Sequence, residues 1–127
     1  MIVVDASAAV LGLLQEGDAR VYLGDEPCAC PHLADAEIVH ALRARVRREE
    51  VDVSVAERAI ETWGRLGLYR VPAVGMLARI WELRENLSAY DATYVAVAEA
   101  LDVPLVTADA RLARALGPTC PITVVHS

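Results

Sequence analysis

Short apolar runs alternate with longer segments of helical periodicity along the whole chain. The apolar runs predict buried strands at residues 2–4, 28–30, 68–71, 104–107 and 122–125. Helices are predicted between them, at residues 6–15, 18–24, 31–48, 54–67, 72–86, 88–101 and 109–117. Because strands and helices alternate, the pattern predicts βαβ units and a parallel sheet with helices on both faces. The length of 127 residues fits one domain spanning residues 1–127.

Local signals mark several helix boundaries. Ile38, Leu42 and Val46 recur at a spacing of four residues and predict the buried stripe of the 31–48 helix. The Ser-Val-Ala-Glu segment at 54–57 has the pattern of a capping box, which predicts that a helix begins there. Pro72 is expected in the first turn of the next helix, where its missing N–H costs nothing.

Four acidic residues lie where a parallel sheet binds ligands, beyond the carboxyl ends of its strands. Asp5 and Asp109 come just after predicted strands. Glu37 and Asp91 lie in the first turns of predicted helices. Because helices that follow strands begin at this edge of the sheet, we expect the four carboxylates to gather there.

Each of these acids also has an ordinary explanation. Asp5 and Asp109 could be helix N-caps. Asp91 could complete a capping box with Ser88, and Glu37 could be favoured by the helix dipole. Taken together, however, four acids at the rim of the core repel one another. A bound divalent cation is the simplest way to offset that repulsion.

The type of ligand indicates the chemistry of such a site. Carboxylate oxygens select hard cations such as Mg²⁺ or Mn²⁺. A cation of this kind lowers the pKa of a bound water and stabilises charge that develops on a phosphodiester. Ser7 and Thr107 flank the acids, and their hydroxyls either hold metal-bound water or serve local capping and strand packing.

Composition narrows the class of protein. The formal net charge of −6 argues against a nucleic-acid binder, unless a metal neutralises clustered carboxylates. All twelve basic residues are arginines. The odd number of cysteines, three, excludes a complete disulfide framework and favours buried reduced thiols. No apolar run is long enough for a membrane span and no export signal is recognised, so the cytoplasm is the expected location.

Two groups of arginines are candidates for contacting phosphate. One group lies late on the 31–48 helix, and the other follows Asp109 directly. They comprise Arg43, Arg45, Arg47 and Arg48 in the first group, and Arg111 and Arg114 in the second. The alternative for both groups is ordinary surface charge, which is favoured near a helix C-terminus.

Large apolar side chains recur at helical spacing in the middle of the chain. Trp63, Leu77, Ile80 and Trp81 predict core packing, with a dimer surface as the alternative. Tyr94 is expected at the edge of the core.

Four segments of the chain, taken in order, resemble a known family. They are VDAS at 4–7, AEIVHAL at 36–42, YDATYVAVA at 90–98 and LVTADARL at 105–112. The set resembles the PIN-domain family, particularly the VapC-type toxins of bacterial toxin–antitoxin pairs. It spans nearly the whole chain, although residues 52–87 carry no diagnostic motif. The resemblance implies a three-layer α/β/α fold with a parallel sheet of strand order 3-2-1-4-5.

The resemblance also implies a function. Asp5, Glu37, Asp91 and Asp109 match the family's acidic residues one by one, with Asp5 and Asp91 expected as direct ligands of Mg²⁺ or Mn²⁺. The implied reaction is endonucleolytic hydrolysis of RNA by metal-activated water. A VapC-type protein would act as a toxin, form a homodimer and be inhibited by a cognate VapB-type antitoxin.

Other classes of protein fit the chain less well. A haloacid-dehalogenase-like phosphatase usually has a second Asp where this chain has Ser7, and it needs a later Lys. A receiver domain also needs a Lys, and the chain has none. Two alternatives stay open: a catalytically silent PIN-like module that binds a protein or nucleic acid, and a nuclease that acts on DNA.

Overall fold

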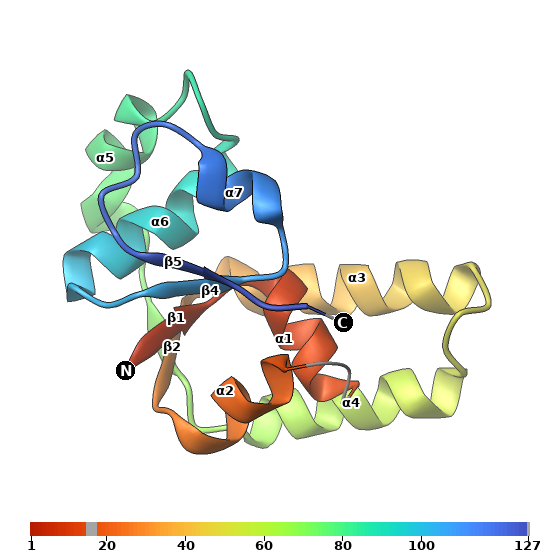
Figure 1. Ribbon diagram of the computed structural model, residues 1–127. Helices are drawn as coiled ribbons and strands as arrows, with labels where there is room; N and C mark the ends of the chain where they lie inside the picture. Colours follow the sequence, from red (N-terminus) through yellow and green to blue (C-terminus); the bar gives the residue numbers. More distant parts are fainter. Residues whose placement is uncertain (15–17, 127) are drawn as a thin grey trace.

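The computed structural model describes residues 1–14 and 18–126 (Figure 1). The strands are β1 (Ile2–Val4), β2 (Cys28–Pro31), β3 (Tyr69–Val71), β4 (Leu105–Thr107) and β5 (Ile122–Val124). The helices are α1 (Ala6–Leu13), α2 (Ala19–Asp25), α3 (Leu33–Arg47), α4 (Val53–Arg65), α5 (Leu77–Glu82), α6 (Ala89–Leu101) and α7 (Ala110–Arg114), with a 3₁₀ helix, η1 (Val74–Met76), before α5.

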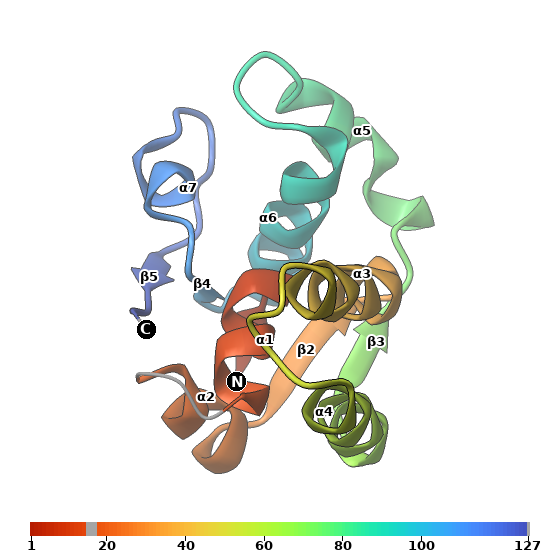
Figure 2. The same cartoon turned by 90° about the vertical axis from the view of Figure 1, so that its right-hand side faces the viewer.

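The strands form one parallel sheet in the order β3-β2-β1-β4-β5. This order and the parallel pairing confirm the predicted fold class. Figures 1 and 2 show α5, α6 and α7 on one side of the sheet and α2 and α4 on the other, which makes three layers. In Figure 1, α3 and α4 continue beyond the end of the sheet as a neighbouring pair of helices.

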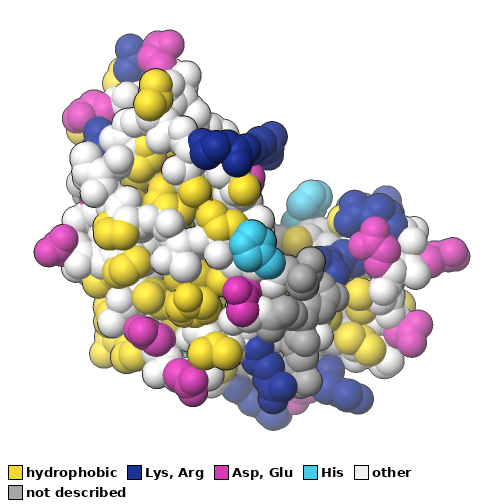
Figure 3. Space-filling view, viewed as in Figure 1, with side chains coloured by type: hydrophobic (Ala, Val, Ile, Leu, Met, Phe, Trp, Pro, Cys, Tyr) yellow, Lys and Arg dark blue, Asp and Glu magenta, His cyan; other side chains and the backbone are white. Residues whose placement is uncertain are grey.

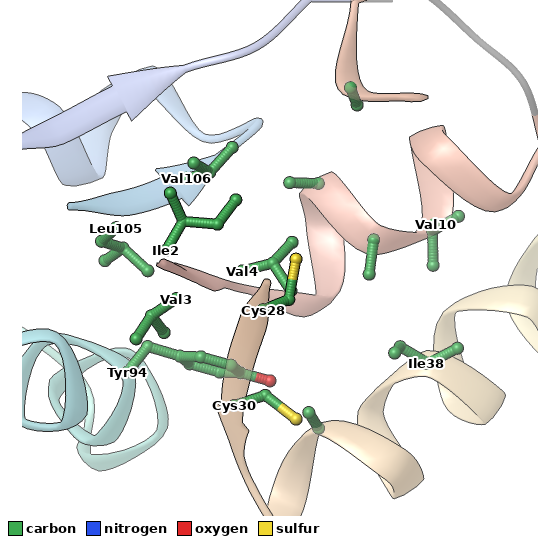
Figure 4. Packing of buried hydrophobic residues seen from close by; sticks show 14 of the residues in the cluster. Ile2, Val3, Val4, Val10, Cys28, Cys30, Ile38, Tyr94, Leu105 and Val106 are labelled. Atoms are coloured by element: carbon green, nitrogen blue, oxygen red, sulfur yellow. The ribbon is translucent and has the colours of Figure 1, made fainter. Parts of the chain in front are cut away.

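The centre of the sheet is apolar on both faces because helices cover both. Val3 on β1 pairs with Ala29 on β2 and with Leu105 on β4, and all three residues are fully buried. Figure 4 shows these strands packed against side chains from the neighbouring helices. Cys28 and Cys30 on β2 are buried free thiols, as predicted, whereas Cys120 is only partly buried and lies outside the strands. Within the described residues, no helix has the length and apolar character needed to cross a membrane.

Two helix starts that local signals predicted are placed differently in the structure. The predicted capping box at Ser54 is wrong, because α4 begins at Val53, one residue earlier. The extended backbone of Asp52 starts that helix, and its side chain makes no capping hydrogen bond. Pro72 is not helical, and α5 begins only after η1. Gly75, which lies in η1, is a poor helix former and favours this later start.

The large apolar side chains divide between core and surface. Trp63 is buried at 4% exposure, and its indole N–H donates a 2.7 Å hydrogen bond to Asp35. Core packing is therefore confirmed for Trp63. It is wrong for Trp81 and Leu77, which are 66% and 59% exposed on the short helix α5. The guanidinium of Arg84 covers the Trp81 ring at 4.3 Å from its centroid.

Gly12 allows α1 to pack closely against α2. A Cβ atom at this position would lie 3.0 Å from Leu23 Cγ and 3.3 Å from the Ala19 carbonyl oxygen. We therefore expect Gly12→Ala to lower the free energy of unfolding by about 1–3 kcal/mol through overpacking. Urea unfolding measures the change.

The control is Gly64→Ala on the exposed face of α4, where an added Cβ would meet nothing within 4 Å. That substitution should raise the free energy of unfolding by about 0.5–1 kcal/mol, because alanine favours a helix over glycine. If both substitutions stabilise the fold, close packing at Gly12 is not important.

Candidate active site

The carboxylate of Asp5 is buried at the carboxyl end of the central strand β1, where its residue is only 6% exposed. Its Oδ1 accepts hydrogen bonds from the Ser7 hydroxyl at 2.6 Å and from the Ala8 amide at 2.9 Å. Its Oδ2 accepts a short hydrogen bond from the Thr107 hydroxyl. Asp5 is therefore the N-cap of α1, and Ser7 and Thr107 lie beside it as the sequence suggested.

Glu37 lies in the first turns of α3 and is half-buried. Its Oε1 accepts a 2.6 Å hydrogen bond from the hydroxyl of Tyr94 on α6. Tyr94 is only 2% exposed, and Figure 4 shows its ring in the same layer of side chains as Val3 and Cys30. The sequence analysis missed this contact. The available signal was the spacing of Tyr94 three residues after Asp91, which places both on one face of a helix.

Asp91 and Asp109 lie at the starts of α6 and α7. The backbone N–H of Asp91 donates to the hydroxyl of Ser88, the N-cap of α6, at 3.1 Å. Asp109 is the N-cap of α7, and its Oδ1 accepts a 2.9 Å hydrogen bond from the Arg111 amide. The Arg111 guanidinium also forms an ion pair with Asp109 at 3.3 Å. The capping hydrogen bonds at Asp91 and Asp109 therefore do not prevent these residues from belonging to the site.

The four acids affect one another's ionisation. Burial raises the pKa of Asp5 above its ordinary value, hydrogen bonds oppose the shift, and the charge of Asp91 adds to it. Burial likewise raises the pKa of Glu37, with further repulsion from Asp91 and Asp5. The pKa of Asp91 is raised by burial and by Asp109. Asp109 is the exception, since a hydrogen bond from Arg111 lowers its pKa. The predicted acids are thus electrostatically coupled.

The four carboxylates are the candidate ligands for a cation. In the part of the chain that the structure describes, no three His, Cys, Asp or Glu side chains are arranged to hold a metal ion. Mg²⁺ usually keeps several waters and takes only one or two carboxylates from the protein. Asp5, Glu37 and Asp91, whose pKa values are raised, offer oxygen donors of the kind that this mode uses. The assignment of individual ligands stays a prediction.

The predicted phosphate-binding arginines lie on α7 and on or just after the later turns of α3. Arg111 is next to Asp109 on α7. Arg43, Arg47 and Arg48 are exposed on the later turns of α3 or just after it, and Arg48 pairs with Glu50 at 2.8 Å. Figure 3 shows basic side chains at several separate places on one face of the molecule, with histidine side chains between two of them.

The fold and the comparisons identify the class of this protein. A family model described as the PIN domain matches residues 2–117, a range that includes all four acids. The structure resembles the crystal structure of PAE2754 from Pyrobaculum aerophilum, with a TM-score of 0.73 and 27% identity over 97% of this chain and 83% of that one. The chain therefore belongs to the PIN domain family.

Within that family the chain is of the VapC type. It is 53% identical over 125 residues to the protein named Ribonuclease VapC9 of Mycobacterium tuberculosis, a match that covers 98% of both chains. It also has the fold of VapBC2 from Rickettsia felis bound to a DNA fragment from their promoter. That structure has a TM-score of 0.70 and 14% identity, and the match covers 99% of this chain and 100% of that one.

The raised pKa of Asp5 predicts a dependence of stability on pH. A carboxyl group with a higher pKa in the folded chain binds more protons there than in the unfolded chain, so stability falls as the pH rises above the ordinary value of 3.8. Asp5→Asn removes this penalty, and its amide can still donate to Thr107. With chelator present, Asp5→Asn should raise the melting temperature at pH 7, and the gain should shrink towards pH 4.

Asp35→Asn is the control with the opposite sign. Hydrogen bonds from Arg70 lower the pKa of Asp35, so its charge stabilises the fold above the ordinary value. The substitution should therefore lower the melting temperature at pH 7 and matter less at low pH. A loss of stability at pH 7 in both variants would contradict the burial penalty at Asp5.

Proposed function

We propose that this protein is a divalent-metal-dependent endoribonuclease that acts as the toxin of a toxin–antitoxin pair. The observation that carries the proposal is the buried carboxylate of Asp5 at the carboxyl end of β1 in a PIN domain, and the charge repulsion among Asp5, Glu37 and Asp91 supports it. The identity of 53% to a protein named Ribonuclease VapC9 supports RNA as the substrate.

The four acids are assigned two different roles in the site. Bound Mg²⁺ or Mn²⁺ would supply an activated water and stabilise the charge that develops on the phosphodiester. Asp5 and Asp91 are the assigned direct ligands. Glu37 and Asp109 complete the site, either as ligands or by accepting hydrogen bonds from metal-bound waters.

Neighbouring side chains orient these acids. The hydroxyls of Ser7 and Thr107 donate to different oxygens of Asp5 and so fix the plane of its carboxylate. The buried hydroxyl of Tyr94 holds Glu37 in the same way. Fixed carboxylates bind a cation with less loss of side-chain entropy than mobile ones.

The proposal includes partners of two kinds. A cognate VapB-type antitoxin is supported by likeness to the Rickettsia felis structure, which is named VapBC2. A homodimer is supported by the exposed side chains of Leu77 and Trp81, because large exposed apolar groups favour an interface. We further propose that the protein acts in the cytoplasm, as one domain.

Removing the charge of Asp5 should abolish cleavage without unfolding the protein. We expect Asp5→Asn to reduce the cleavage rate of labelled RNA by more than about 100-fold, as loss of a metal ligand does. Glu57→Gln, an exposed acid on α4, is the control with the same loss of charge and should retain activity. Full activity of Asp5→Asn, or of the original chain in excess chelator, would contradict the proposal.

The same assay distinguishes the alternatives. Equal cleavage of DNA and RNA of the same sequence would favour a DNA-directed nuclease. Binding of nucleic acid without cleavage of either, in Mg²⁺ and in Mn²⁺, would favour a catalytically silent module.

Divalent ions should stabilise the fold through the same site. Because a cation binds only the folded arrangement of carboxylates, an excess of about 100 times its dissociation constant should add about 2.7 kcal/mol to the free energy of unfolding. Melting temperatures across Mg²⁺ and Mn²⁺ titrations measure this gain. Asp5→Asn should show a smaller rise, whereas an unchanged melting temperature in the original chain would count against the metal site.

A further inference from the structure

A pocket of about 650 Å³ opens directly beside the acidic site. It lies between α1, α3 and the segment that follows β5. Ser7, whose hydroxyl donates to Asp5, forms part of its wall. Ala108 forms another part, and its amide donates to the Ser7 hydroxyl oxygen at 2.9 Å. The pocket is therefore continuous with the residues assigned to the reaction.

The floor of the pocket is apolar. Val10 and Leu11 of α1 face Ala41 and Ala44 of α3 across it. Because the side chains of the two alanines are small, they leave space between α1 and α3 at this point. An apolar floor in a pocket of this size suits the flat face of a nucleobase, because bases stack on apolar and aromatic surfaces whatever their sequence.

The rim of the pocket carries positive charge. Arg45 lines it from α3, Arg48 from the position just after α3, and His126 from the segment after β5. Arg48 pairs with Glu50, but both side chains are about half exposed, and an exposed pair of this kind is worth little. A phosphate can therefore replace Glu50 at low cost.

His126 is held beside this rim by a hydrogen bond. The backbone N–H of His126 donates a 2.8 Å hydrogen bond to Asp18, so an acidic side chain also lies nearby. Arg45 follows Glu37 by eight residues, which is ~12 Å along a helix axis. At about 3.4 Å per stacked nucleotide, the distance from the acids to the rim corresponds to roughly four nucleotides or fewer.

We propose that this pocket binds the RNA strand next to the scissile phosphate, with a base over the apolar floor and phosphates at Arg45 and Arg48. The inference rests on the proposed nuclease function and adds to it the direction in which the strand leaves the acids, along α3. A single nucleic-acid strand is the occupant because the pocket joins a basic rim to an apolar floor in a chain whose net charge is −6.

The proposal divides the arginine group of α3. Arg45 and Arg48 line the pocket, whereas Arg43 and Arg47 are exposed on the same helix and are not among the residues that line it. Two double variants thus remove the same charge from neighbouring positions: Arg45→Ala with Arg48→Ala, and Arg43→Ala with Arg47→Ala. Only the first pair alters the pocket.

The test measures binding of a fluorescein-labelled single-stranded RNA in chelator, by anisotropy over a range of salt concentrations. The pocket variant should bind on the order of tenfold more weakly, and the slope of log affinity against log salt should fall by about 1.4, since two phosphate contacts are lost. The control variant should change affinity by less than about twofold. Ala44→Leu, which fills the floor without changing charge, should also weaken binding.

A small phosphodiester separates this inference from the proposed function. Bis(4-nitrophenyl) phosphate with Mn²⁺ needs the acids but is too small to extend along the pocket, so the original chain should hydrolyse it whether or not the pocket binds RNA. Equal RNA affinity of the two double variants would overturn the pocket assignment. Absence of hydrolysis of both RNA and the small phosphodiester by the original chain would overturn the nuclease function, while RNA binding alone would still decide the pocket.

If the first double variant is less stable than the original chain, Arg48→Ala and Arg47→Ala provide the same comparison between adjacent residues. Weaker RNA binding by Arg48→Ala alone supports the pocket. Equal weakening by both substitutions reveals general surface charge and overturns it.

Discussion

The arrangement of the site depends on burying the carboxylate of Asp5 at the edge of the sheet where the strands end. Removing Asp5 from water costs free energy, and the cost is offset by hydrogen bonds from Ser7, Ala8 and Thr107. These donors belong to α1 and to β4, which lie at opposite ends of the sequence. The contacts that make the buried charge tolerable therefore also fix the two elements that border the site.

Much of the fold could be predicted from short-range patterns. Alternating apolar runs and helical segments predicted a parallel sheet, and the carboxyl ends of its strands then marked the place of Asp5 and Asp109. The strand order came from the family resemblance, because hydrophobic pattern alone permits several right-handed arrangements of the same strands. The electrostatic coupling of the acids could also be predicted, because these residues lie at the ends of strands and the starts of helices. Those boundaries are the features that sequence reveals best.

The remaining contacts depend on how elements pack against one another. The hydroxyl of Tyr94 reaches Glu37 only because α6 and α3 meet at this edge of the sheet. Arg45 and Arg47 look alike in sequence, and only the position of α1 beside α3 separates the one that lines the pocket from the one that does not. The capping-box motif predicted that α4 begins at Ser54. The helix begins one residue earlier because Asp52, whose backbone is extended, is its N-cap.

The hydrogen bond between Asp5 and Thr107 joins residues that are 102 positions apart. During synthesis, Asp5 and Glu37 leave the ribosome before Thr107 and Asp109, which follow them in the sequence. Until β4 is available to pair with β1, an unfinished chain holds only part of the acidic set. The candidate site is therefore assembled only after β4 has been made, and a product truncated before β4 lacks it.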